Sequence, residues 1–519
     1  MRGVIFMRKM KRIMACAASM AVILTGVSAP LSQADAEMVQ TGWRGDVNYD
    51  GWLSVADIVV LQKHLSGIEA LSADMFEEFA DVTADGRVNI ADLALLKKCL
   101  DGGTEWIGIF EEQTEPEPEV KPFINAPIEA FGASLPSQDE ASLVIFYVDF
   151  PDCTYENKLT AEEVQNIAFG EENTESQYYP FESMSAFYDR SSKGAMNLTG
   201  KVFSYTAQNS ISYYNEDKVA LAKECFEAFN ESEDFSQYDK DSDGMIDATL
   251  FTVPVSANED HWWPCAGGFG DYEYTVDGVK VGHIITGNAE PSDPMNFNSS
   301  YLHEMGHCMG LPDYYLYYSD DFDSMHGSAG TELMDADAYS DFCSYSKLML
   351  GWYREDQISV YDSAQGSQTF TLKNAQTDEG NCVIVPCGTL DENYFSEYFI
   401  IEYSTDGGNN TGIANLWWQE VESGVRIHHV YSEIYSDYWW TYPKYQNGSE
   451  FTGMNDDGIR LIRLVNDGNG PFRTGDIVSE ETSGFGWYDS SENETIDTGI
   501  TISIGELTEE GYTITIQNK

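Results

Sequence analysis

The pattern of apolar and polar positions divides the chain into regions of different character. At the N-terminus, an apolar run from Met14 to about Val27 follows a basic start and precedes small residues at Ala29 and Ala36. This order is typical of a cleaved export signal, which we place at residues 1–36. An uncleaved anchor is the alternative, but the run is short for a bilayer and no later segment reaches about 18 apolar residues. We therefore expect an exported protein without a membrane span.

Two short helices are predicted behind a repeated loop. The stretches GDVNYDGWLSVADIVVLQKHLSG, from Gly45, and ADVTADGRVNIADLALLKKCLDG, from Ala80, align without gaps. Each copy carries oxygen-bearing side chains at loop positions 1, 3 and 5, glycine at 6, an apolar residue at 8 and Asp at 12. Alternate side chains can direct their oxygens at one Ca²⁺, and the glycine permits the sharp turn. Asp-Gly turns are common, but two matched copies favour calcium loops. The expected ligands are Asp46, Asn48, Asp50, Asp57, Asp81, Thr83, Asp85 and Asp92.

The rest of the chain shows strand patterns. The stretch ASLVIFYVDFPD, from Ala141, is typical of a buried strand, and alternating runs after Gln357, such as FIIEY and ITISIG, favour a β-sandwich-like region. Between loops and strand, EEQTEPEPEVKP is typical of an extended, self-repelling linker. The predicted fold class is therefore multidomain: a small all-α domain, an α/β (α+β) domain and a β-rich domain. The predicted segments after the signal are 37–103, a linker at 104–126, 127–355 and 356–519.

The net charge and the cysteine spacing exclude several classes of function. The chain has 519 residues and a formal net charge of −59. A chain this acidic repels nucleic acid and anionic membranes, so neither is an expected partner. The nine cysteines include no CxxC pair, which argues against a zinc ribbon or a redox motif. Export would permit disulfides, but the spacing does not indicate which cysteines would pair.

The stretch LHEMGHCMGLPDYY, from Leu302, carries candidate metal chemistry. On a helix, His303 and His307 share one face, with Glu304 beside them. Gly310 can end the helix, so that Asp313 can supply a third ligand after the turn. Two histidines and one carboxylate leave a fourth position open, as catalytic zinc requires. The alternative is a core helix with incidental histidines, but burying both imidazoles without partners would be costly.

The repeated loops resemble a type I dockerin, over roughly Thr41 to Gly103. The resemblance implies a cohesin module of a scaffolding protein, in a cellulosome-like assembly, as the partner. Loop positions 10 and 11 help to set cohesin choice in that family. Here they are Val55-Ala56 and Ile90-Ala91, which depart from the Ser-Thr pair common in clostridial forms and leave the choice of cohesin open.

From about Ala141 to the C-terminus, the chain resembles the immune inhibitor A family of secreted metallopeptidases, which are metzincin-like. The motif HExxHxxGxxD carries the resemblance, together with YDKDSDGMIDATLF, ELMDADAYSDFCSYSKLMLGW, EYFIIEYSTDGG and GVRIHHV. It implies zinc bound by His303, His307 and Asp313, Glu304 as general base, and Met334 beneath the metal, with Met325 as a weaker rival. No clear pro-segment is present, so the means of latency stays open.

A further acidic loop lies at Asp239, Asp241, Asp243 and Asp247, whose alternation also suggests calcium; a solvated acidic turn is the alternative. Together these features predict a secreted zinc endopeptidase that acts on protein or peptide and is docked through a dockerin. Two alternatives stay open. One is a non-catalytic binding subunit on a peptidase fold, and the other is a zinc hydrolase for ester or amide groups of polysaccharide.

Overall fold

The protein is described by a computed structural model, in which the chain divides into two compact units, Met1–Val120 and Lys121–Lys519. Each unit is considered by itself. The structure describes residues 38–71, 79–104, 108–112, 121–257, 259–267, 274–315, 329–335, 339–415, 422–436, 441–445, 459–466, 470–489 and 494–519. The predicted export signal lies outside these residues. Among them, no helix combines the length and the apolar character that crossing a membrane would require.

The first unit contains the two predicted helices, α2 (Val55–Leu65) and α4 (Ile90–Leu100). Each helix begins with the same capping box, because the last residue of the calcium loop also serves the helix. The Ser54 side chain accepts from the Ala56 N–H, and the Ser54 N–H donates to Asp57. Asn89 and Asp92 repeat this arrangement. The helices bury Leu61, Leu93 and Leu96 against one another and against the loops.

A strand pair in this unit was not predicted. Strand β1 (Met38–Trp43) pairs antiparallel with β2 (Gly108–Glu112), from Met38 opposite Glu112 to Trp43 opposite Gly108. The first unit is therefore not all-α, and part of the predicted linker at 104–126 is a strand. At the far end of that linker, the Ile124 N–H donates to Tyr353 O at 2.9 Å, so this segment belongs to the second unit. Neither pairing was predicted, because each partner lies far away in sequence.

The second unit begins with a six-stranded sheet of order β4-β3-β5-β8-β6, in which β7 pairs with β8. Strands β4, β3, β5 and β8 are parallel, and β6 is an antiparallel strand at one edge. The strands are β3 (Asp139–Asp149), β4 (Met196–Thr206), β5 (Met245–Thr252), β6 (Cys265–Gly267), β7 (Thr275–Val276) and β8 (Val279–Gly287). The strand predicted from Ala141 is β3, which is buried from Ala141 onward.

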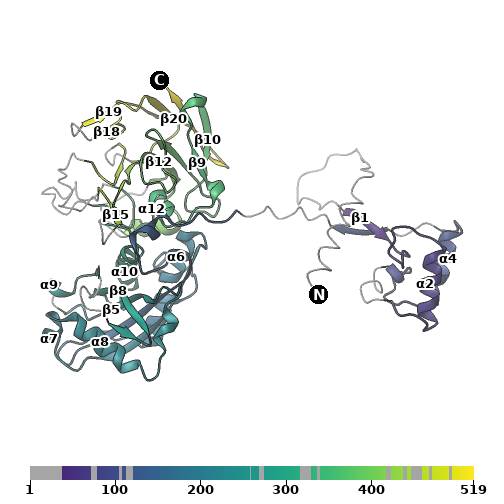
Figure 1. Cartoon of the computed structure of the whole chain (residues 1–519), viewed down its shortest axis with the longest axis horizontal. Coiled ribbons are helices and arrows are strands. Elements are labelled where there is room, and N and C mark those ends of the chain that lie inside the picture. The colour runs from purple at the N-terminus through teal and green to yellow at the C-terminus, as the bar shows by residue number, and fades with distance from the viewer. Residues whose placement is uncertain are drawn as a thin grey trace. The chain divides into compact units, whose positions relative to one another are not determined.

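Helices cover both faces of this sheet (Figure 1). Alternate β3 side chains enter two separate cores. Leu143 and Ile145 enter the first core, with α5, α6 and α10, whereas Val144 and Phe146 enter the second, with α8. The helices of the unit are α5 (Ala161–Phe169), α6 (Met184–Ser192), α7 (Ile211–Asn215), α8 (Lys218–Phe229), α9 (Glu259–Trp262), α10 (Pro294–Cys308) and α12 (Ser344–Met349).

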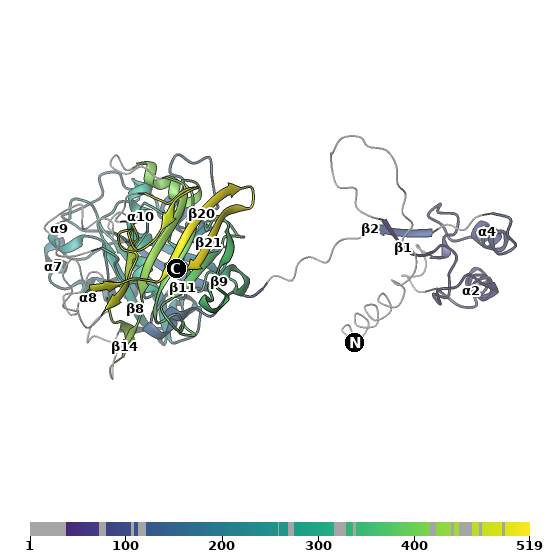
Figure 2. The same cartoon turned by 90° about the horizontal axis from the view of Figure 1, so that it is seen from above.

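The C-terminal third forms a sandwich of two sheets, of orders β16-β13-β12-β11-β9 and β10-β21-β20-β17. In Figure 2, β20 and β21 lie side by side in the second of these sheets. The strands of the two sheets are β9 (Ile358–Val360), β10 (Gln368–Leu372), β11 (Cys382–Pro386), β12 (Glu397–Ser404), β13 (Gly424–Tyr431), β16 (Ile462–Leu464), β17 (Ile477–Val478), β20 (Ile500–Thr508) and β21 (Gly511–Asn518). Two further strand pairs are β14 (Ile434–Ser436) with β15 (Thr441–Pro443), and β18 (Trp487–Asp489) with β19 (Glu494–Ile496).

The predicted boundary at 355/356 does not separate two bodies, because the five-stranded sheet is buried on both faces. Val383 and Ile401 face the sandwich interior, whereas Ile384 and Ile400 join the first core. Hydrogen bonds cross the boundary as well: the Ser344 N–H donates to Glu402 at 2.6 Å. Among the described residues all eight cysteines are free thiols. The second unit is thus a single packed body.

Candidate metal centre

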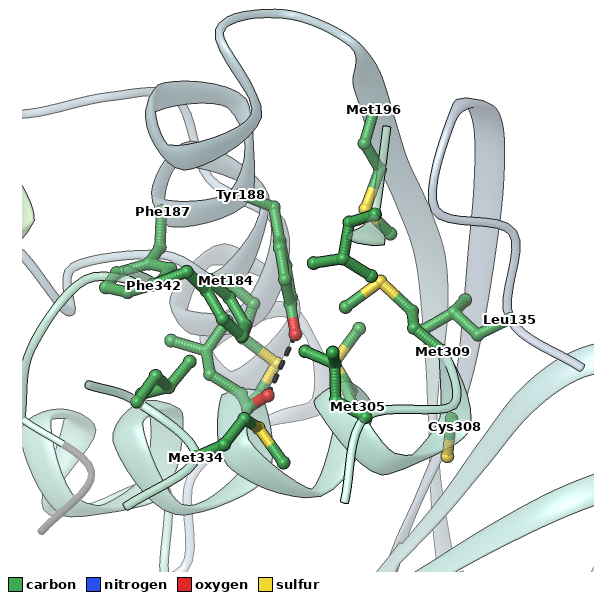
Figure 3. Close-up of a cluster of buried hydrophobic side chains, with 14 of the residues drawn as sticks. Leu135, Met184, Phe187, Tyr188, Met196, Met305, Cys308, Met309, Met334 and Phe342 are labelled. Atoms are coloured by element: carbon green, nitrogen blue, oxygen red, sulfur yellow. Dashed lines mark hydrogen bonds between the residues drawn. The ribbon is translucent and has the colours of Figure 1, made fainter. Parts of the chain in front are cut away.

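Helix α10 carries the two histidines into the interior. Pro294 stands in its first turn, which suits a residue without an N–H, and the backbone turns left-handed at Gly310 (φ 98°) soon after the helix ends. Met305 and Met309 pack into the first core (Figure 3). The Tyr188 hydroxyl donates to Leu302 O at 2.8 Å and ties α6 to the same helix. The helix therefore holds its histidines on a rigid support.

The imidazoles of His303 and His307 converge on Asp313. His303 Nδ1 lies 2.8 Å from Leu333 O, and His307 Nδ1 lies 2.7 Å from Leu311 O. Donation from each Nδ1–H to its carbonyl leaves the Nε2 lone pair of each ring for a metal ion or a proton. These Nε2 atoms lie 3.0 and 3.3 Å from Asp313 Oδ1, and the three ligand atoms lie within 4.8 Å of one another. The structure thus brings together all three predicted zinc ligands.

Charge attraction dominates this group of residues. Burial would raise the pKa of the Asp313 carboxyl, but its hydrogen bonds to His303 and His307 hold that pKa well below its usual range. Burial would lower the pKa of His307, but the Asp313 carboxylate raises it to about 9. The site therefore favours a positive charge, and a metal ion would bind in competition with a proton.

Glu304 lies next to this group. Its side chain is largely buried, and burial raises the pKa of its carboxyl despite the nearby histidines. The backbone N–H of Ala266, in the edge strand β6, faces the carboxylate and opposes this rise in its pKa. A raised pKa brings a carboxylate closer to the range in which it can take up and return a proton near neutral pH.

Met334, which the family resemblance implies beneath the metal, packs against α10. A Cβ atom added at Gly306 would lie 2.3 Å from Met334 Sδ, so the methionine occupies the space that the glycine leaves. The Tyr314 N–H donates to Met334 O at 2.9 Å, which joins the turn that contains Met334 to the segment that carries Asp313. Met325, the weaker candidate, lies outside the described residues.

Two residues at the site were not predicted. The Tyr315 hydroxyl hydrogen-bonds to the Asp313 carboxylate. Glu332 is buried, and it accepts from the Met334 N–H and from Ser346 Oγ, both at 3.1 Å. Tyr315 stands two residues after Asp313, the last residue of the motif, so its position offered a signal. Glu332 carried no local signal, because its role depends on a contact with α12.

The acidic loop before β5 gathers three of its four predicted ligands. Carboxylate oxygens of Asp239, Asp241 and Asp247 lie within 4.8 Å of one another. Asp239 Oδ1 is buried and has no hydrogen-bond partner among the described residues. Burial raises the pKa of Asp247 to about 7, although Ser142 and the Lys240 N–H donate to it. Asp243 is outside this group and instead accepts from the Met245 N–H at 2.7 Å.

The two loops of the first unit are matched in their contacts. Asp46 accepts from the N–H groups of Asp50 and Gly51, at 3.1 and 2.9 Å. Asp81 accepts from Asp85 and Gly86 in the same way, at 3.1 and 2.8 Å. The twelfth residues, Asp57 and Asp92, are completely buried and accept from Asn48 and Thr83. Buried carboxylates at loop positions 1 and 12 are the oxygen ligands that Ca²⁺ uses.

Comparison with protein families agrees with this geometry. Residues 44–101 match the family model described as the dockerin type I domain. These residues form a type I dockerin. The predicted dockerin is thereby confirmed. Dockerin domains bind calcium and indicate docking to a cohesin in a cellulosome-like complex, and dockerin proteins are typically extracellular. No curated protein matches the chain.

Proposed function

We propose that the second unit is a zinc endopeptidase, which the dockerin attaches to a cohesin of a scaffolding protein. The observation that supports this most is the convergence of two imidazole Nε2 atoms and one carboxylate beside Glu304. Two nitrogen ligands and one oxygen ligand are a donor set that zinc takes in catalytic sites. The orientation of each histidine by a backbone carbonyl fits the same role.

Zinc bound there would supply Lewis acidity, which makes water more acidic and a carbonyl carbon more electrophilic. Glu304 takes a proton from the attacking water and returns it to the departing amine, since a buried carboxylate with a raised pKa can perform both steps. The edge strand β6 lies beside Glu304 and offers a place where an extended peptide can add as a further strand. A peptide bond in such a strand would lie next to both groups.

The test uses the full chain with zinc, with casein as substrate. The wild type is expected to cleave casein and to hold about one zinc per chain, whereas Glu304→Ala should hold zinc and lose at least about a thousandfold in rate. The matched control is Glu231→Ala, at an exposed position of the same unit, which should behave as wild type.

Each other result has a distinct meaning. A folded wild type that binds no zinc would exclude the proposal. Zinc in both proteins without cleavage of casein, but with release of acetate from acetylated xylan, would favour the polysaccharide hydrolase. Zinc without either activity would favour a binding subunit.

The acidic loop of the second unit is proposed as a structural calcium site with Asp239, Asp241 and Asp247 as ligands. The buried, unpartnered Asp239 oxygen and the raised pKa of Asp247 support this, because a cation would satisfy the oxygen and stabilise the charged carboxylates. In the dockerin, the side chains of Val55 and Ile90 are 68% and 71% exposed. These apolar side chains at matched positions are proposed to contact the cohesin.

A further inference from the structure

A cavity of about 590 Å³ lies on the other side of the edge strand from the candidate metal centre. Strand β6 separates the two. Ala266 packs toward the first core, on the α10 face of the sheet, and its N–H reaches Glu304. All three residues of β6, Cys265, Ala266 and Gly267, line the cavity, together with Ile284 and Thr286 of β8 on the α8 face. A single short strand therefore borders both sites.

An extended peptide paired with β6 would present its side chains to these two sites in alternation. Successive side chains of a strand point to opposite faces of a sheet. When one substrate side chain faces α10 and the catalytic groups, its neighbour faces the cavity. The cavity is thus placed to select one residue of the substrate.

The cavity has a cationic group at its wall. Lys218 Nζ donates to Thr286 Oγ1 at 3.0 Å and lies 5.0 Å from the centroid of the Trp262 ring. The chain has 87 acidic and 28 basic residues, so most cations can find a carboxylate. Yet among the described residues no carboxylate forms an ion pair with Lys218, and its side chain is half-buried.

Within the described part of the chain, neither carboxylate of the lining forms an ion pair with Lys218. Glu216 and Asp217 are exposed at the rim, and Asp217 accepts from the Ala220 N–H at 3.0 Å as the cap of α8. Lys223, which adds a second positive charge, also lines the cavity. A half-buried ammonium group in a partly apolar cavity is a good partner for a carboxylate, since it is only partly hydrated.

We infer that this cavity is a specificity pocket for an acidic side chain of the peptide substrate, with Lys218 as the group that recognises the carboxylate. The inference rests on the proposed peptidase function and adds the substrate class. It assigns Lys218 a role in recognition, because its ammonium group lies on the opposite face of β6 from Glu304.

The test compares peptides that differ only by Glu or Gln at each position around the scissile bond. The full wild-type chain with zinc is expected to prefer Glu at one position by about tenfold in kcat/KM, and Lys218→Met should abolish that preference. Lys218→Arg should keep it, which separates loss of charge from a folding defect. Lys201→Met is the matched control, since Lys201 is an exposed lysine on β4, at the other edge of the sheet.

A binding assay decides the inference without catalysis. Zinc-loaded Glu304→Ala is titrated with fluorescent Glu and Gln peptides, with and without Lys218→Met. Tighter binding of the Glu peptide that disappears in the double variant supports the inference, even where the wild type cleaves nothing and the peptidase proposal fails. No preference for Glu, or a preference that survives Lys218→Met, overturns it. Inhibition by free glutarate without any preference among peptides would assign the cavity to a small carboxylate and would also overturn it.

Discussion

Two buried glutamates at the candidate site have different surroundings. Glu304 faces the histidines and Asp313, so the charges of these groups shift the pKa of its carboxyl. Glu332 instead accepts from the N–H groups of Met334 and Cys343 and from the Ser346 hydroxyl. Its carboxylate thereby joins the turn at Met334 (the methionine turn) to α12. Glu304 therefore has a proposed catalytic role, whereas Glu332 has a structural role.

Glu332 makes the stability of the second unit depend on pH. Burial raises the pKa of its carboxyl from 4.5 to about 7, against the lowering effect of its hydrogen bonds. Between these values the folded state binds a proton that the unfolded state has lost. The free energy of unfolding should therefore fall by roughly 3 kcal/mol as the pH rises from about 4.5 to about 7, and this contribution should stay constant above that range.

Denaturant unfolding of the full chain, followed by fluorescence across this range, measures the effect. Glu332→Gln should remove this part of the pH slope, whereas Glu231→Gln, at an exposed position, should keep it. Equal slopes in the wild type and Glu332→Gln would contradict the prediction.

At the scale of the elements, helix α10 and the methionine turn fit together through a single glycine. Replacing Gly306 by Ala would place Cβ 2.3 Å from Met334 Sδ, and Met334 is fully buried. Overpacking of this kind costs about 1–3 kcal/mol, which exceeds the gain of up to about 1 kcal/mol from helix propensity. The displaced turn also carries Leu333 O, which orients His303. We therefore expect Gly306→Ala to lower both the stability and the zinc affinity, the latter by about tenfold or more.

The control for this prediction is Gly407→Ala, because a Cβ there meets only Thr405 Oγ1 at 3.4 Å. Unfolding curves and zinc titrations of both variants measure the two effects. In the double variant Gly306→Ala/Met334→Ala, the combined loss of stability should be smaller than the sum of the single losses. Strictly additive losses would show that the glycine and the methionine do not interact.

The sequence predicted those elements whose signal is local. The repeated loops predicted one helix after each copy, and α2 and α4 are present, although they begin within the last turn of each loop, at Val55 and Ile90. The apolar run from Ala141 predicted β3.

The strand β2 was not predicted, because its partner β1 lies tens of residues away. The buried Glu332 was not predicted, because its contacts with Cys343 and Ser346 leave no periodic pattern. The same holds for Lys218, whose surroundings are assembled from α8, α9 and β8.

At the scale of the whole molecule, the division into two units predicts two calcium effects. The dockerin has buried carboxylates at Asp57 and Asp92, and its core is small, so removal of calcium should melt α2 and α4. The second unit has a large core and should stay folded without calcium. If the loop at Asp239 binds calcium, however, chelation should also lower the melting temperature of this unit by a few degrees.

Calorimetry of the full chain, with calcium and with a calcium-selective chelator, separates these effects. Asp57→Ala/Asp92→Ala should remove the dockerin transition and leave the second transition sensitive to calcium. Asp241→Asn should keep the dockerin transition and make the second transition insensitive to calcium, since it removes one charge from the loop before β5. If the melting temperature of the second transition in the wild type does not change with calcium, the three carboxylates of this loop bind no calcium. The acidic loop would then be a solvated turn, and calcium would act on the docking unit alone.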